Sequence, residues 1–152
     1  MKTAFAAAML AFLAACVPVG NSNTARDRTV PMASQVDATA VRLSGDWVVR
    51  TSFSETARPG ERLRLRRGQG GALWLDDIAL PARGQGRFGG AGGSPEWWVL
   101  WLDADNRTAA IGTPGGEFGW IMDRKARGGM DRIRAAKEIM QWSGYDMARA
   151  TE

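Results

Sequence analysis

Few side chains in this chain could perform covalent or acid–base chemistry. The 152 residues include no histidine and a single cysteine, Cys16. The hydroxyls of Ser52 and Ser54 therefore have no imidazole to activate them as nucleophiles. Asp76 and Asp77 are adjacent in a stretch expected to be extended, where neighbouring side chains point to opposite faces and do not share a metal ion. The sequence predicts a protein that is not an enzyme, with no catalytic residue, cofactor or metal site.

One glycine-rich segment fits the dinucleotide-binding pattern G-x-G-x-x-G. Residues 84–89 read Gly-Gln-Gly-Arg-Phe-Gly. That motif needs a helix to follow it, whereas residues 90–95 read Gly-Ala-Gly-Gly-Ser-Pro. We therefore exclude a nucleotide cofactor and expect these glycines to permit a bend or a β-bulge.

The N-terminus predicts export from the cytoplasm. Lys2 precedes a short apolar run over residues 4–14, which is too short to span a bilayer and predicts a signal peptide over residues 1–15. Cys16 follows Leu13-Ala14-Ala15, and this arrangement resembles a bacterial lipoprotein signal. The resemblance implies lipid attachment to Cys16, and hence an outer-membrane lipoprotein of the cell envelope that faces the periplasm. The alternative is ordinary secretion with a chance cysteine.

The remaining chain divides into a linker and one domain. Residues 16–40 contain proline, glycine, asparagine and few large apolar groups, which predicts a flexible tether. Residues 41–152 are then one compact domain. The formal net charge of +4 permits contact with anionic lipid or nucleic acid without requiring either. Because the chain is predicted to be exported, we expect no nucleic-acid partner.

Short apolar runs separated by turn residues predict an all-β barrel or sandwich. The seven predicted strands cover residues 47–54, 61–67, 72–76, 78–88, 97–103, 107–112 and 117–123. From Met130 the apolar spacing becomes helical, with Ile133, Ala136 and Met140 on one side. A helix of three to four turns is expected to end near Gly144 and to pack outside the strands.

Several segments, taken in order, resemble a bacterial lipocalin of the outer-membrane lipoprotein type. They are Gly45-Asp46-Trp47, Leu102-Asp103, Arg107, Gly112-Thr113-Pro114, Trp120-Ile121 and Arg124. The resemblance implies a small antiparallel lipocalin-like β-barrel with one C-terminal helix packed outside. Such a barrel has eight strands where the residues give seven, so we expect seven or eight.

The resemblance also assigns a structural role to Gly45, Trp47 and Arg124. In this family the corresponding tryptophan plugs the closed end of the barrel, and a basic residue after the last strand stacks across its ring. Arg124 shares its strand parity with Phe118, Trp120 and Met122. One departure is Asn106, which stands where the family usually has an aromatic residue.

A lipocalin would bind a small hydrophobic molecule, and the family suggests a fatty acid or a lysophospholipid. Alternation along the strands points Val49, Phe53, Trp101 and Trp120 inward as candidate ligand-binding residues, and Trp98 as well if the parity is reversed. The alternative is a protein-binding β-barrel lipoprotein such as a periplasmic protease inhibitor. The C-terminal helix favours the lipocalin. The oligomeric state is not predicted.

A basic stripe alternates with leucine in one predicted strand. It consists of Arg62, Arg64, Arg66 and Arg67. Two interpretations remain open. The stripe is either a solvated outer face or a contact surface for anionic lipid headgroups.

Overall fold

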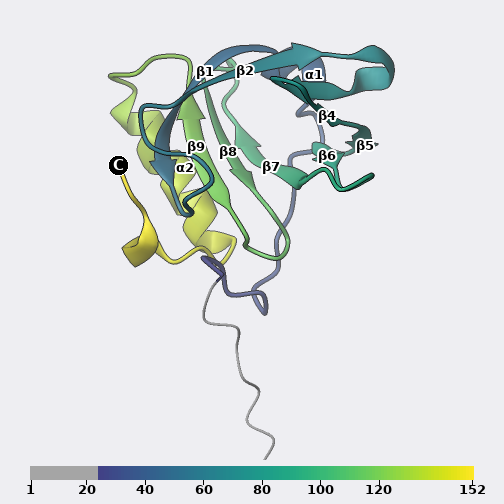
Figure 1. The fold of residues 1–152 in the computed structure, drawn as a ribbon. Coiled ribbons are helices and arrows are strands. Elements are labelled where there is room, and N and C mark those ends of the chain that lie inside the picture. The colour runs from purple at the N-terminus through teal and green to yellow at the C-terminus, as the bar shows by residue number, and fades with distance from the viewer. Residues whose placement is uncertain (1–23) are drawn as a thin grey trace, which may run out of the picture.

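The protein is a nearly closed antiparallel β-barrel with one long helix on its outer face (Figure 1). The computed structural model describes residues 24–152, so the predicted signal peptide and Cys16 lie outside the described residues. Within that range, none of the helices combines the length and apolarity that a membrane-crossing helix needs. The expected small antiparallel all-β barrel with a C-terminal helix packed outside is confirmed.

Nine strands of residues 24–152 form a single sheet. They are β1 (Gly45–Ser52), β2 (Arg62–Arg67), β3 (Leu73–Leu75), β4 (Ile78–Leu80), β5 (Ala82–Gly84), β6 (Arg87–Gly89), β7 (Glu96–Leu102), β8 (Thr108–Gly112) and β9 (Gly119–Asp123). The helices are α1 (Ala40–Leu43), α2 (Met130–Trp142) and the 3-10 turns η1 (Gln69–Gly71) and η2 (Met147–Arg149).

The strand order makes the sheet curl onto itself with one interruption. The order is β4-β3-β2-β1-β9-β8-β7-β6-β5, so the first strand pairs with the last. The two edge strands, β4 and β5, follow each other in the chain and are separated only by Pro81. Proline has no backbone N–H for a sheet ladder and suits an edge. The barrel is therefore interrupted between β4 and β5, a place we call the seam.

The expected count of seven or eight strands is wrong, because residues 78–88 form three short strands rather than one. Pro81 ends β4, and a turn with left-handed backbone at Gly84, Gln85 and Gly86 separates β5 from β6. The register of the β5–β6 pair shifts between Ala82 and Gly84, which is the irregularity expected of this glycine-rich segment.

Alternation along the strands separates an interior core from an outer one. The interior core includes Trp47, Val49, Leu63, Leu65, Leu73, Leu80, Phe88, Trp97, Val99, Leu102, Ile111, Trp120 and Met122. The outer core joins the barrel wall to α2 through Leu100, Ala110, Ile121, Ile133, Ala136, Met140 and Tyr145. The helix contributes the apolar face that its sequence predicts, and Gly144 follows its end with a φ of 91°. Three arginines of β2, at positions 62, 64 and 66, alternate outward with solvent-exposed side chains.

Two β-bulges reverse the alternation partway along β1 and β7. The pairing of β1 with β9 shifts between Val49 and Thr51, and the pairing of β7 with β8 shifts between Val99 and Trp101. A bulge inserts one residue, so every later side chain moves to the opposite face. Residues after each bulge that simple alternation would place in the interior therefore face outward.

The described part of the predicted tether is packed against the barrel. Ala25, Arg26 and Ala38 are buried, although residues 16–40 were expected to be a flexible linker. The Arg26 guanidinium donates to the carbonyls of Ser143 (2.6 Å), Pro114 (2.9 Å) and Val30. Few large apolar residues are needed for such docking, because buried hydrogen bonds to main-chain carbonyls hold the segment.

Candidate ligand-binding site

One end of the barrel is closed by a tryptophan and an arginine. The ring of Trp47 is fully buried, and its indole Nε1 donates to the Leu43 carbonyl at 2.6 Å, which ties it to α1. The Arg124 guanidinium carbon lies 3.6 Å from the centre of this ring. This is the stacking that the resemblance implies, and a partly desolvated guanidinium over indole contributes about 1–2 kcal/mol.

Gly45 makes room for that arginine. Its φ is 115°, and a side-chain carbon there would lie 2.7 Å from Arg124 Nη1. The guanidinium donates to the carbonyls of Arg42, Asp46 and Asn106 at 3.0–3.2 Å. Burial lowers the pKa of Arg124, and nearby carboxylates, including Asp46, oppose that shift. The closed end is a rigid plug rather than an entrance.

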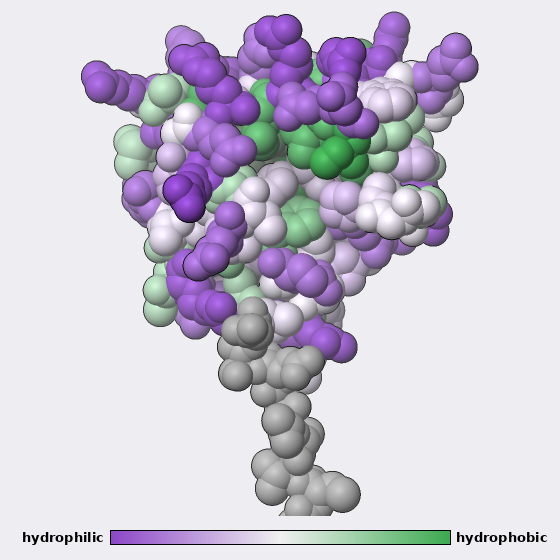
Figure 2. Space-filling model, in the orientation of Figure 1, coloured by the Kyte–Doolittle hydropathy of each residue, from purple (hydrophilic) through white to green (hydrophobic). Residues whose placement is uncertain are grey.

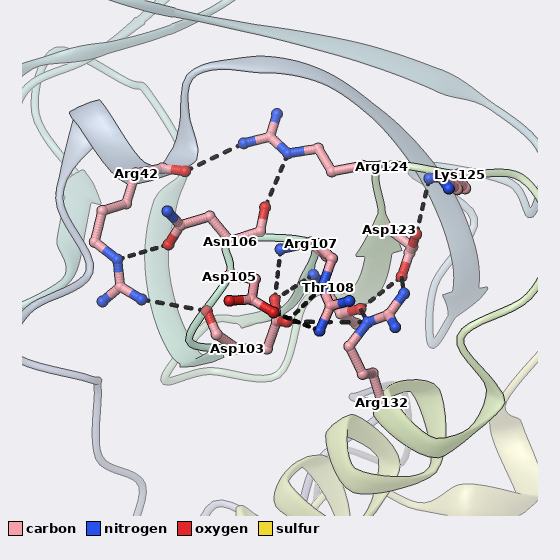
Figure 3. Close-up of polar contacts among 10 residues, drawn as sticks. All are labelled: Arg42, Asp103, Asp105, Asn106, Arg107, Thr108, Asp123, Arg124, Lys125 and Arg132. Carbon is pink, nitrogen blue, oxygen red and sulfur yellow. Dashed lines mark hydrogen bonds and ion pairs between the residues drawn. The ribbon is translucent and has the colours of Figure 1, made fainter.

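The turn between β7 and β8 supports the plug (Figure 3). Asp103 Oδ1 accepts from the backbone N–H groups of Arg107 (2.5 Å) and Thr108 (2.7 Å). Burial alone would raise the pKa of Asp103, but these two N–H donors and the Arg107 guanidinium outweigh it and hold that pKa below its usual value. At Asn106, where the family usually has an aromatic, the backbone is left-handed with φ 57° and the side chain accepts from Arg42 Nε at 2.7 Å.

An ion pair connects this turn to the start of α2. Arg132 Nη2 donates to Asp123 Oδ2 at 2.9 Å, and Arg132 Nε donates to the Thr108 hydroxyl at 2.8 Å. The Thr108 hydroxyl donates in turn to Asp123 Oδ2 (Figure 3). The hydrogen bond to Asp123 raises the pKa of Arg132. The helix is therefore fixed to the last strand by a buried, fully paired charge.

An aromatic cluster fills the interior toward the other end of the barrel. The Trp97 and Trp120 rings meet edge-on with centres 5.1 Å apart, and Phe118 stacks on Trp120 at 4.8 Å. The indole Nε1 atoms of both tryptophans are buried and have no hydrogen-bond partner within residues 24–152. Buried donors usually have a partner. These two N–H groups are available to an acceptor that reaches the interior.

A cavity of about 210 Å³ lies beside the seam, and we call it the side cavity. Its walls come from three places: residues 36–41, which include α1; the end of β2 with the following turn at Gly71; and residues 82–88 of β5 and β6. Ala38, Ala40 and Phe88 belong both to this wall and to the interior core. The floor of the side cavity is therefore continuous with the core of the barrel.

The rim of the side cavity combines exposed apolar side chains with two cations. Val36 is 70% exposed and Val41 is 62% exposed. Figure 2 shows an apolar area on this face, below a row of hydrophilic side chains, where Figure 1 draws α1 and β4. Arg67 and Arg87 also line the cavity. Arg87 lies 5.3 Å above the Trp98 ring and donates to the Gln85 side chain. This arrangement offers an apolar hollow with positive charge at its edge.

The predicted ligand-binding residues divide between the two faces of the barrel wall. Val49 and Trp120 lie in the interior core. Phe53, Trp98 and Trp101 lie outside, in the outer core against α2 and Tyr145. The bulges explain the difference for Phe53 and Trp101, which follow the reversals in β1 and β7. The inward orientation inferred from simple alternation is thus wrong for Phe53 and Trp101. Trp98, expected inward only if the parity were reversed, keeps the outward position that simple alternation gives it.

Sequence reasoning missed most of the side cavity. Ala40 and Phe88 come from segments that show no ligand signal, and Ala40 falls at the end of the predicted linker. Only Arg67 belongs to a segment with such a signal, the basic stripe. Trp97 is not among the predicted ligand contacts, although it is fully buried at the centre of the aromatic cluster. Its inward parity with Val99 could have identified it, since both precede the bulge.

The cavities and clusters described above offer places where a small molecule could bind. No group of three His, Cys, Asp or Glu side chains within residues 24–152 is arranged to hold a metal ion. Comparison with known families finds a match over residues 87–151 to a model described as a lipocalin-like domain. That range begins at β6 and includes α2, so it covers the strands where the sequence resemblance was densest. No curated protein matches the chain.

Proposed function

We propose that this protein binds one acyl chain of a fatty acid or a lysophospholipid in the side cavity. Its barrel fold and its match to the lipocalin-like domain support its assignment as a lipocalin. A small-ligand-binding barrel is what the family supports in general. The acyl ligand, the non-enzymatic role and the attachment to a membrane are parts of the proposal.

The observation that carries the proposal is the apolar side cavity with arginines at its edge. At about 210 Å³ the cavity is smaller than the roughly 300–1,000 Å³ of sites for drug-sized ligands. That size suits a single slender chain rather than a fused ring system. Its apolar wall includes Ala38, Ala40 and Phe88, so the chain would lie against the core of the barrel.

Apolar transfer supplies the driving force for such binding. Each buried methylene contributes about 0.8 kcal/mol, so eight methylenes contribute roughly 6 kcal/mol before the cost of ordering the ligand. Arg67 and Arg87 at the rim would pair with a carboxylate or a phosphate, and a guanidinium holds such groups with two parallel hydrogen bonds. The arginines would orient the ligand with its headgroup toward solvent.

The proposed setting is the cell envelope. A lipid on Cys16 would hold the barrel at the periplasmic face of the outer membrane, close to a supply of acyl ligands. The motif at the end of the apolar N-terminal run supports this part of the proposal. Replacing Cys16 with Ser would then move the protein from the membrane fraction to the soluble periplasmic fraction.

Charge reversal at the rim tests the headgroup assignment. Arg67→Glu should weaken binding of oleate at least fivefold, because it replaces attraction for the carboxylate with repulsion. The same variant should bind oleyl alcohol as the wild type does, because that ligand has the same chain without the charge. Titration calorimetry measures both ligands.

The matched control is Arg62→Glu, an exposed arginine of β2 that does not line the side cavity. It should leave the oleate affinity unchanged. Equal losses for Arg62→Glu and Arg67→Glu would contradict a headgroup contact at the rim. A folded wild-type protein that bound neither ligand would favour the protein-binding alternative instead.

A further inference from the structure

A second cavity, of about 230 Å³, lies at the junction of β9 and α2, on the outside of the barrel. Its lining contains five cationic side chains and one carboxylate: Arg107, Arg124, Lys125, Arg127, Arg132 and Asp123. Gly128 and Gly129 complete it. Nothing in the acyl-binding proposal uses this place, which we call the basic cavity.

The positive charge of the basic cavity is only partly compensated by the protein. The Asp123 carboxylate already accepts hydrogen bonds from Arg132 and from the Thr108 hydroxyl. Arg107 pairs with Asp103 and Asp105, yet its side chain remains 50% exposed. Within residues 24–152, the Lys125 ammonium and the Arg127 guanidinium have no ion-pair or side-chain hydrogen-bond partner. Figure 3 shows Lys125 beside Asp123 and Arg132 rising toward them from α2.

The backbone adds to the positive electrostatic potential of the basic cavity. Met130 begins α2, a helix of 13 residues, and its N-terminus carries partial positive charge from unpaired N–H groups. Gly129 occupies the N-cap position with a left-handed backbone and supplies no capping side chain. Arg50 donates to the carbonyls of Lys125 and Gly128 at 3.1 Å, which fixes the loop that carries the two unpaired cations.

We propose that the basic cavity binds a phosphate group. Cations that approach it from the turn before β8, from the loop after β9 and from α2 surround a space that an anion would neutralise. A phosphate has three or four acceptor oxygens and can accept from several such donors at once, whereas a carboxylate has two. The volume exceeds that of a bare ion, so the group is expected as a phosphomonoester, either free or as the headgroup of an anionic lipid.

Binding of free phosphate compounds is the first test. Titration calorimetry of the full-length protein in detergent, at constant ionic strength, should show saturable binding of inorganic phosphate and of glycerol 3-phosphate. Lys125→Gln and Arg127→Gln should each weaken this binding about threefold to tenfold, because each removes one charge from the cavity. Both residues are exposed, so the variants should keep the thermal midpoint of the wild type.

The matched control is Arg134→Gln, which removes one exposed charge from α2 outside the basic cavity. It should leave the affinity unchanged. A second arm measures cosedimentation with vesicles of phosphatidate in phosphatidylcholine, compared with phosphatidylcholine alone.

The outcomes separate the sources of the phosphate. Saturable binding of the soluble compounds, weakened at Lys125 and Arg127 only, assigns a free phosphomonoester. Binding to phosphatidate vesicles alone, with the same dependence on the variants, assigns a lipid headgroup. Equal effects of all three substitutions, or no binding in either arm, would overturn the proposal. No acyl ligand of the side cavity is used in the soluble arm, so its result is independent of the proposed function.

Discussion

Three residues close one end of this barrel, and each has a separate physical task. Trp47 fills the space and is anchored through its indole N–H to Leu43. Arg124 covers the ring and satisfies three main-chain carbonyls. Gly45 adopts a backbone conformation that side chains disfavour, and it leaves the space that the guanidinium occupies. The plug therefore depends on shape as much as on charge.

Substitution of Gly45 by Ala should destabilise the fold by about 2–4 kcal/mol, the sum of backbone strain and displacement of Arg124. Gly60→Ala is the matched control, because Gly60 also has a positive φ of 89° but open space around it. The free energy of unfolding of that variant should fall by about 1–2 kcal/mol, from backbone strain alone. Urea denaturation measures both. Equal losses would show that Arg124 does not constrain position 45.

The elements that matter most for function are the irregular ones. The bulges in β1 and β7 decide which aromatic side chains face the interior. The turn after β7 holds the plug through Asp103. The segment before α1 forms one wall of the side cavity.

The turn after β7 should make the free energy of unfolding depend on pH. The pKa of Asp103 is lower in the folded protein than its unfolded value of about 3.9. Its contribution is therefore fully present above that pH and is lost as the pH falls through the folded pKa. Asp103→Asn should cost about 1–3 kcal/mol at pH 7, because one oxygen acceptor replaces a charged carboxylate.

The difference in unfolding free energy between wild type and Asp103→Asn should shrink as the pH falls below about 4. Urea denaturation at pH 7, 4 and 3 measures it. A difference that stayed constant over this range would show that the carboxylate charge has no part in holding the turn.

The N-terminal segment should behave as part of the domain. Arg26→Gln should destabilise the protein by about 2–3 kcal/mol, because buried carbonyls of Ser143 and Pro114 lose a charged donor. Arg28→Gln, at an exposed position two residues later, should change stability by less than about 0.5 kcal/mol. Thermal unfolding compares them. If Arg26→Gln lowered the stability no more than Arg28→Gln does, the segment would be only loosely attached.

Sequence alone predicts the regular elements well and the irregular ones poorly. The alternation of Leu63 and Leu65 with arginine, and the helical spacing of Ile133 and Met140, both reflect burial on one face and are visible in the residues. The position of Trp101 depends on a bulge that leaves no mark in the hydrophobic pattern.

The packed N-terminal segment was missed for a related reason. Its docking rests on Arg26 and on the Gln35 side chain, which exchanges hydrogen bonds with the Leu102 main chain. Polar residues with few apolar neighbours are typical of linkers, so composition predicts a tether. The three-dimensional partners of such residues are far away in the sequence.

As a whole molecule, the protein is a barrel closed at one end, filled with apolar side chains inside, and interrupted between β4 and β5. The side cavity is lined by β5 and β6 on one side of this interruption, and its lining includes neither Trp47 nor Arg124, so a ligand could reach it without displacing the plug. The basic cavity lies on the outside, where β9 meets α2. The two proposed sites thus lie on separate surfaces of the fold.

The most direct test of acyl binding is to fill the side cavity. Ala82 lines it from the edge strand β5 and is exposed, so Ala82→Trp adds a large side chain there without disturbing the core. Titration calorimetry of oleate should give saturable binding with one site for the wild type and a loss of at least tenfold in affinity for Ala82→Trp. Ala148→Trp, at an exposed position of η2, should bind as the wild type does. Unchanged oleate affinity in folded Ala82→Trp would contradict the assignment of the acyl chain to the side cavity.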